Sequence, residues 1–336
     1  MDETVTGLQR ERADTSWLGA LRGAAISLDG MNALVTGGSR GLGLELARVL
    51  RRKGANVAIV ARDKGELERA LGLLELVASP SPRKLVGVVC DLTQGAAIDT
   101  MLHSVQASLG PVDVLVNNAG IIQVGPLDAM TLEDFEQALA LHCFAPLRTM
   151  SGLRASMRER GFGRIANIAS IGGLVSVPHL LPYSVGKFAL VGLSQGMRSE
   201  LARDGILVST ITPGLMRTGS PRQALFKGNR QKEYAWFAIS DSLPFLSMPA
   251  DRAARRIVRA IERGEPQLTL GLPAKLAALA NGLAPSLVTR ALTLVNAFLP
   301  RGSDTRTHKG YESESAVAPS VLTALTERAA VRNNET

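Results

Sequence analysis

Tyr183 and Lys187 are the pair of side chains in this sequence best suited to proton transfer. They are four residues apart, so in a helix both lie on the same face. A free phenol has a pKa of about 10, but a nearby ammonium stabilises the phenolate and could lower that value by roughly 1–3 units. The pair predicts a tyrosine that exchanges protons with a ligand. The alternative is a surface pair without function.

A glycine-rich segment forms a second candidate site. It follows a predicted strand and opens a predicted helix, where glycines permit a tight turn and a close approach to a pyrophosphate, whose charge the free N–H groups attract. An ordinary strand-to-helix turn is the alternative, but the flanking elements favour a dinucleotide. The residues expected to bind it here are Thr36, Gly37, Ser39, Arg40, Gly41, Leu42 and Gly43.

The end of the second predicted strand indicates which dinucleotide binds. An acid there would hold free ribose hydroxyls, whereas a 2′-phosphate requires a cation. The strand ends at Ala61 and is followed by Arg62, and Arg40 could reach the same phosphate through paired hydrogen bonds. These residues favour NADPH over NADH, although Asp63 comes one residue later.

Short apolar runs alternate with helical patterns, which is typical of parallel strands joined by helical crossovers. The pattern predicts an α/β fold with a doubly wound, Rossmann-type sheet of about seven strands. The expected strands are Asn32–Thr36, Asn56–Ala61, Leu85–Cys90, Val112–Asn117, Gly163–Ala169, Ile206–Thr212 and Gln267–Gly271.

The chain divides into a central domain and flanking segments. We expect an N-terminal extension over 1–29, a catalytic domain over 30–271 with a substrate lid at about 215–248, and an amphipathic helical extension over 272–301. Within that extension Pro285 can start a helix and Pro300 stop it. The polar composition of 302–336 predicts a mobile tail with at most one short helix.

From residue 30 to about 265 the sequence strongly resembles the short-chain dehydrogenase/reductase family. The resemblance rests on motifs in family order and at family-like intervals: the turn from Thr36 to Gly43, Asp91-Leu92, Asn117-Asn118-Ala119-Gly120, Ser170, Tyr183-x-x-x-Lys187, and Pro213-Gly214 with Thr218. It implies a nicotinamide cofactor, hydride transfer to or from a carbonyl or alcohol carbon, and a homodimer or homotetramer.

The resemblance also implies individual roles. Ser170 would orient the substrate oxygen, Tyr183 would transfer the proton, and Lys187 would hold the nicotinamide ribose. Asp91 would face the adenine and Thr218 would contact the nicotinamide carboxamide. The cofactor-binding residues expected beyond the turn are Arg62, Asp91, Leu92, Asn118, Ala119, Gly120, Tyr183, Lys187, Pro213, Gly214 and Thr218.

His142 departs from the family pattern. It stands where the family has an asparagine that is associated with a water relaying protons from the lysine. A histidine ring can both donate and accept, so His142 could preserve this relay, or it could fill the helix interface.

Two groups of side chains bear on the substrate and on partners. The lid contains large apolar residues, among them Phe226, Tyr234 and Phe237, which suggest a hydrophobic substrate or ordinary packing of the lid. An arginine-rich helix over 251–263, together with the 285–299 segment, could contact an anionic membrane surface. Packing on the domain or in an oligomer interface is the alternative.

Composition excludes several classes of protein. The net charge of +8 is scattered and aromatic residues make up only 4%, which argues against nucleic-acid binding. The two cysteines predict neither a disulfide framework nor a metal site and fit a reducing, cytoplasmic compartment. An NADPH-dependent oxidoreductase is the leading hypothesis. The alternative is a regulator or scaffold with the same fold that binds NADPH without turnover.

Overall fold

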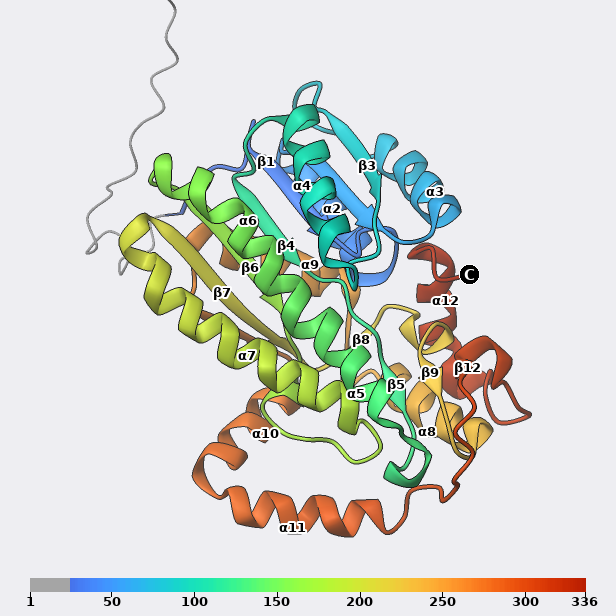
Figure 1. Cartoon of the computed structure of the whole chain (residues 1–336). Coiled ribbons are helices and arrows are strands. Elements are labelled where there is room, and N and C mark those ends of the chain that lie inside the picture. The colour runs from blue at the N-terminus through green and yellow to red at the C-terminus, as the bar shows by residue number, and fades with distance from the viewer. Residues whose placement is uncertain (1–24) are drawn as a thin grey trace, which may run out of the picture.

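The structure is a computed structural model that describes residues 25–336, and a seven-stranded parallel sheet forms its centre (Figure 1). The strand order is β11-β7-β6-β4-β1-β2-β3. The predicted doubly wound sheet is therefore confirmed, and no expected strand end differs from the observed one by more than about two residues. The bounds are β1 Asn32–Thr36, β2 Asn56–Ala61, β3 Leu85–Val89, β4 Val114–Asn117, β6 Gly163–Ile168, β7 Ile206–Pro213 and β11 Gln267–Leu270.

Helices cover both faces of this sheet, because alternate side chains of each strand point to opposite sides. On β1, Ala33 and Val35 pack with one set of helices and Leu34 with the other. The first set is α2 Gly41–Arg52, α3 Lys64–Glu75 and α9 Ala250–Arg263. The second set is α4 Gly95–Leu109, α6 Ala145–Glu159 and α7 Leu181–Leu201, to which α5 Leu132–Leu139 adds contacts with α7.

The lid is a small layer beside the carboxyl ends of the central strands (Figure 1). Phe226, Tyr234 and Phe237 are buried there against one another, with ring centroids 5.5 and 6.0 Å apart. These aromatic side chains therefore form the core of the lid itself. The lid contains β8 Leu215–Arg217, β9 Leu225–Phe226, α8 Arg230–Ser242 and β10 Ser247–Pro249, and β5 Gln123–Val124 pairs with β9.

The C-terminal part contains more regular structure than the sequence indicated. Two helices, α10 Leu272–Leu283 and α11 Pro285–Asn296, form the extension, and α11 runs along the lower edge of the molecule in Figure 1. The polar segment predicted to be mobile packs against the lid: β12 His308–Lys309 pairs with β9, and α12 Ala324–Arg332 contacts α8. The expected extension over 1–29 lies mostly outside the described residues.

The strand order indicates where in the sheet a ligand is expected to bind. The chain fills the sheet outward from β1 through β2 and β3, then returns to place β4 on the other side of β1. In such sheets ligands bind outside the carboxyl ends of the strands at this switch point. Thr36 and Asn117 end the two strands there.

Candidate active site

The turn after β1 has the geometry that close approach of a ligand to the backbone requires. Gly37 and Gly41 have φ of 62° and 57°, in the left-handed region that side chains disfavour. A Cβ on Gly37 would stand 2.8 Å from Ala119 Cα, and one on Gly43 would collide with the Gly37 carbonyl oxygen. The cradle therefore fits a dinucleotide phosphate, with glycine needed for both conformation and space.

The second wall of this region is the segment after β4. Thr36 Oγ1 accepts the N–H groups of Asn118 and Ala119 at 3.0 and 3.2 Å, while Asn118 Nδ2 donates to the carbonyl oxygens of Thr36 and Gly37. These bonds fasten the two turns to each other. A Cβ on Gly120 would stand 2.9 Å from His142 Nε2 and 3.6 Å from Lys187 Nζ, so glycine is needed there too.

Asn117 belongs to a buried network below this wall. Its Nδ2 donates to Asn167 Oδ1 at 2.8 Å, and its Oδ1 accepts from Thr149 Oγ1 at 2.8 Å. Asn167 Nδ2 in turn donates to Ser194 Oγ. A network of satisfied polar groups fixes β4, β6, α6 and α7 relative to one another.

Ser170, Tyr183 and Lys187 meet at the end of β6. Ser170 Oγ accepts the Gly172 N–H at 3.0 Å, and a Cβ on Gly172 would stand 3.2 Å from Tyr183 Cε1 and 3.5 Å from Ser170 Oγ, so the two side chains lie close together. Lys187 Nζ lies 5.7 Å from the centre of the Tyr183 ring and donates to the Ile168 carbonyl oxygen at 2.8 Å. The helix α7 thus brings its tyrosine and lysine to the serine that follows the neighbouring strand.

Burial has a larger effect than neighbouring charges on the pKa values of Tyr183 and Lys187. It raises the pKa of Tyr183, against the hydrogen bond with Ser170, and lowers the pKa of Lys187 to about 7. The sequence predicted a lowered tyrosine pKa from the lysine charge alone. In this structure desolvation has the larger effect on both groups: Lys187 is buried, and Tyr183 is half-buried.

His142 lies in a π-helical stretch, Ala140–Phe144, between α5 and α6. Its Nε2 accepts the Ile121 N–H at 3.1 Å, and its ring lies edge-on to the Tyr183 ring with centroids 5.4 Å apart. Burial, and then the Lys187 charge, hold the pKa of His142 well below its usual range. The ring is therefore neutral near pH 7 with its Nε2 lone pair engaged by Ile121, an arrangement that positions the segment after β4.

We expect His142→Leu to lose activity and His142→Asn to keep it, because leucine leaves the Ile121 N–H without an acceptor. An unpaired buried N–H costs about 1–3 kcal/mol. Turnover and thermal unfolding of both variants check this. Equal activity in the two variants would reduce His142 to packing, whereas rescue by asparagine alone supports a polar role.

The start of α3 contains an acid, Glu66, that the sequence analysis did not identify. Glu66 accepts from Arg40 Nη1 at 3.0 Å and from Ser39 Oγ at 3.3 Å. Asp63 caps α3 by accepting the Glu66 N–H at 2.7 Å. The three-residue spacing of Asp63 and Glu66 indicated a helix start, but not that its acid faces Arg40. Arg62, at the end of β2, is exposed.

The remaining predicted cofactor residues surround the same edge of the sheet. Asp91 Oδ1 accepts from Thr93 Oγ1 at 2.8 Å, and Leu92 is buried beside it. The Gly214 N–H donates to the Leu270 carbonyl oxygen, and Thr218 Oγ1 accepts the Ser220 N–H at 3.1 Å. Both segments follow the carboxyl ends of strands, β3 and β7.

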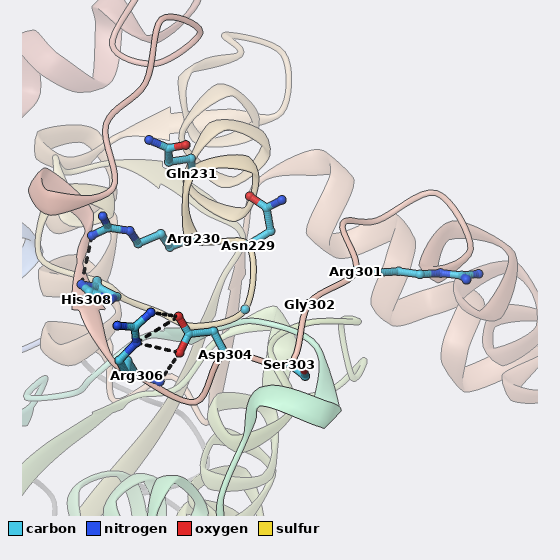
Figure 2. A pocket seen from close by; sticks show the side chains of 10 residues that line it. Asn229, Arg230, Gln231, Arg301, Gly302, Ser303, Asp304, Arg306 and His308 are labelled. Atoms are coloured by element: carbon cyan, nitrogen blue, oxygen red, sulfur yellow. Dashed lines mark hydrogen bonds and ion pairs between the residues drawn. The ribbon is translucent and has the colours of Figure 1, made fainter.

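Two hollows lie outside this constellation. A polar one of about 520 Å³ opens between the start of α8 and the segment after α11, where Asp304 pairs with Arg306 and Arg230 contacts His308 (Figure 2). A larger one of about 860 Å³ lies between the loop after Ser170 and α11. The loop after Ser170 forms part of the wall of the larger hollow, which is therefore the better candidate for a substrate site.

Comparison with known proteins agrees with this fold. The model of the short chain dehydrogenase family matches residues 31–226. The chain belongs to that family.

Proteins with similar sequences are named for different activities. A dehydrogenase/reductase SDR family protein 7-like from Drosophila melanogaster is 32% identical over 80% of this chain and 83% of its own. A gluconate 5-dehydrogenase from Gluconobacter oxydans is 33% identical over 57% of this chain and 73% of its own. A putative ketoacyl reductase from Streptomyces coelicolor is 38% identical over 55% and 70%.

Solved structures show the same likeness. A short-chain dehydrogenase from Streptomyces avermitilis has a TM-score of 0.66 and 30% identity, covering 80% of this chain and 97% of its own. An L-sorbose reductase from Gluconobacter frateurii, solved with NADPH and L-sorbose, has a TM-score of 0.64 and 26% identity, covering 73% and 97%.

Proposed function

We propose that this protein transfers a hydride between NADPH and a carbonyl or secondary alcohol carbon, with Tyr183 as the acid and base. The observation that carries this proposal is that Ser170, Tyr183 and Lys187 meet near Gly120, in the segment that Asn118 joins to the glycine-rich turn. Oxidation of NADPH in the presence of a panel of ketones tests it. A regulator that binds NADPH without turnover would give no oxidation with any of them.

The proposed mechanism follows from the charge that develops during reduction. The bound dinucleotide supplies the hydride. Negative charge then grows on the carbonyl oxygen, so a proton donor and a hydrogen-bond donor must stand beside it. Ser170 Oγ accepts the Gly172 N–H, and its hydroxyl hydrogen can be donated to that oxygen. Tyr183 gives the proton, and a protonated Lys187 favours the phenolate that remains.

The preference for NADPH rests on Arg62. It is exposed at the end of β2, and the structure gives it no ion pair or hydrogen bond within residues 25–336. Arg40 contributes only if it exchanges its bond to Glu66 for a phosphate. The G. frateurii reductase was solved with NADPH, which supports this choice of cofactor.

We place the substrate among hydrophobic carbonyl compounds because of the larger hollow. Its walls include Leu174, Val175 and Val177 from the loop after Ser170 and Leu292 and Leu299 from α11 and the residues that follow it. Its volume, about 860 Å³, lies in the range of small-molecule sites. The names of the relatives include a gluconate dehydrogenase and a ketoacyl reductase, so they agree on the type of reaction and differ in substrate.

Peripheral contact with an anionic membrane is proposed for the outer face of α10 and α11. Leu283 is 78% and Phe298 83% exposed, and the sequence from 266 to 303 contains three cations and no acid. Apolar side chains flanked by cations suit an anionic lipid surface. The helix α9 packs beside α2, away from α11 (Figure 1), so its arginines are not part of this proposal. Among the described residues, no helix is long and apolar enough to cross a bilayer.

Sedimentation with lipid vesicles tests this surface. We expect the protein to sediment with phosphatidylglycerol vesicles, less so at high salt, and the Leu283→Glu, Phe298→Glu variant to stay in solution. Leu76→Glu is the matched control, since Leu76 is 84% exposed at the end of α3. If the double variant sediments like the wild type, or changes only the oligomeric state, the face does not contact lipid.

The setting proposed for the enzyme is the cytoplasm, as a homodimer or homotetramer. The compartment is proposed because Cys90 and Cys143 are free cysteines, and the oligomeric state is proposed from the family. Neither nucleic acid nor a metal has a place in this proposal.

A further inference from the structure

The last residues of the chain lie across the glycine-rich turn. After α12, the carbonyl oxygen of Asn333 accepts the Gly41 N–H at 2.9 Å. This amide begins α2 and is among the groups expected to attract a dinucleotide phosphate. Asn333 and Glu335 are buried, with 0% and 3% of their surface exposed. Figure 1 shows α12 and the C-terminus next to α3.

Side chains of the same segment join three parts of the proposed cofactor site. Asn334 Nδ2 donates to the carbonyl oxygens of Ser39 and Glu66 at 2.9 and 3.0 Å, and its Oδ1 accepts from Arg69 Nε at 3.1 Å. Asn333 Nδ2 donates to the Thr218 carbonyl oxygen at 3.0 Å. The segment thus bridges the turn, α3 and the loop after β7.

Glu335 places a carboxylate over the turn. One oxygen lies 3.5 Å from Arg40 Nε, and the other lies 2.7 Å from the position that a Cβ on Gly41 would take. A negative group at a helix N-terminus beside an arginine has the surroundings that a phosphate requires. The carboxylate and a dinucleotide phosphate would compete for this space.

We propose that Asn333, Asn334 and Glu335 form a displaceable plug of the cofactor site, which must leave the turn before a dinucleotide binds. This inference rests on the proposed function, because it takes the turn to be the dinucleotide site. Burial raises the pKa of Glu335 to about 7; Glu66 adds to this effect and Arg40 opposes it. Burial therefore disfavours the charged carboxylate and offsets part of the stability that the hydrogen bonds of this segment provide.

Competition has a measurable consequence. If only the undocked fraction of the protein binds cofactor, the observed Kd exceeds the intrinsic Kd by the inverse of that fraction. Removing the plug should therefore tighten binding without any new contact. The several hydrogen bonds of Asn333 and Asn334 make a change of at least about tenfold the expected size.

Calorimetric titration with NADPH tests the plug on the full chain and three variants. We expect a chain ending at Arg332, and the variants Asn334→Ala and Glu335→Ala, to bind NADPH more tightly than the wild type, the truncated chain by at least about tenfold. Thr336→Ala is the matched control, because Thr336 is exposed and adjacent to the plug. Hydrogen exchange gives a second readout: saturating NADPH should speed exchange in the wild-type residues 325–336.

Opposite results overturn the proposal. If truncation weakens NADPH binding and NADPH slows exchange in the tail, the segment completes the site and does not block it. If all variants bind NADPH with the same affinity, the plug alone is refuted. If no variant binds NADPH or NADH, the proposed function fails together with the plug.

Discussion

Replacing Tyr183 by phenylalanine is expected to lower kcat by about 10²–10⁴-fold, the usual contribution of general acid–base catalysis. The phenylalanine ring keeps the edge-on contact with His142, so the site should keep its shape. NADPH affinity should therefore change little. The expected result is a loss in kcat with binding preserved, measured by steady-state kinetics and by NADPH titration.

The control for this variant is Tyr311→Phe, which removes a hydroxyl from a partly exposed tyrosine in the C-terminal segment. It should turn over like the wild type. Near wild-type turnover in Tyr183→Phe would show that another group transfers the proton. A large loss of NADPH affinity would instead show that the hydroxyl mainly supports the cofactor.

Replacing Arg62 by alanine is expected to lower kcat/KM for NADPH by at least about tenfold and to leave NADH nearly unaffected. A hydrogen bond to a charged group contributes about 1.5–3 kcal/mol, and about 1.4 kcal/mol corresponds to a factor of ten. NADH has no 2′-phosphate and therefore loses no contact. Comparing kcat/KM for the two cofactors measures the effect directly.

The double change Ala61→Asp, Arg62→Ala should shift the preference further, because the new carboxylate can accept from free ribose hydroxyls and repels a phosphate. Arg52→Ala is a matched control, since Arg52 is exposed at the far end of α2. A wild type that prefers NADH would refute the phosphate contact, as would an equal loss for both cofactors. Asp63 would then be the residue to test, although it caps α3 in this structure.

The central sheet and the meeting of the proposed catalytic residues could be predicted because both depend on local patterns. Apolar runs such as Asn56–Ala61 mark buried strands, and the spacing of Tyr183 and Lys187 places both on one helix face. The order of the motifs then indicated the family. These features do not require knowledge of contacts between distant parts of the chain.

The contacts of Arg40 could not be predicted in this way. Its partners, Glu66 and Glu335, come from α3 and from the end of the chain, and local sequence does not show that they converge. The tail is polar, so its composition predicted mobility. In the structure it is bound by contacts with distant residues, such as the Asn334 hydrogen bonds and the ion pairs of Arg222 with Glu314 and Glu327, which local sequence does not show.

The pKa of Tyr183 also depends on how strongly the fold removes the side chain from water. The sequence shows that a lysine lies nearby, but not that desolvation in the fold exceeds the effect of the lysine charge. The packing of the aromatic side chains in the lid could not be predicted from local sequence either. Phe226 and Tyr234 could have lined a substrate site, but in the fold they pack on each other.

Transfer of deuterium from NADPH labelled at the hydride position tests the central claim most directly. The protein is mixed with labelled NADPH and a set of hydrophobic ketones, and the alcohol products are analysed by mass spectrometry. We expect an alcohol with deuterium on the former carbonyl carbon in the wild type, and at most a trace with Tyr183→Phe. NADPH that binds but transfers no deuterium to any carbonyl compound, sugars and acyl ketones included, would contradict it.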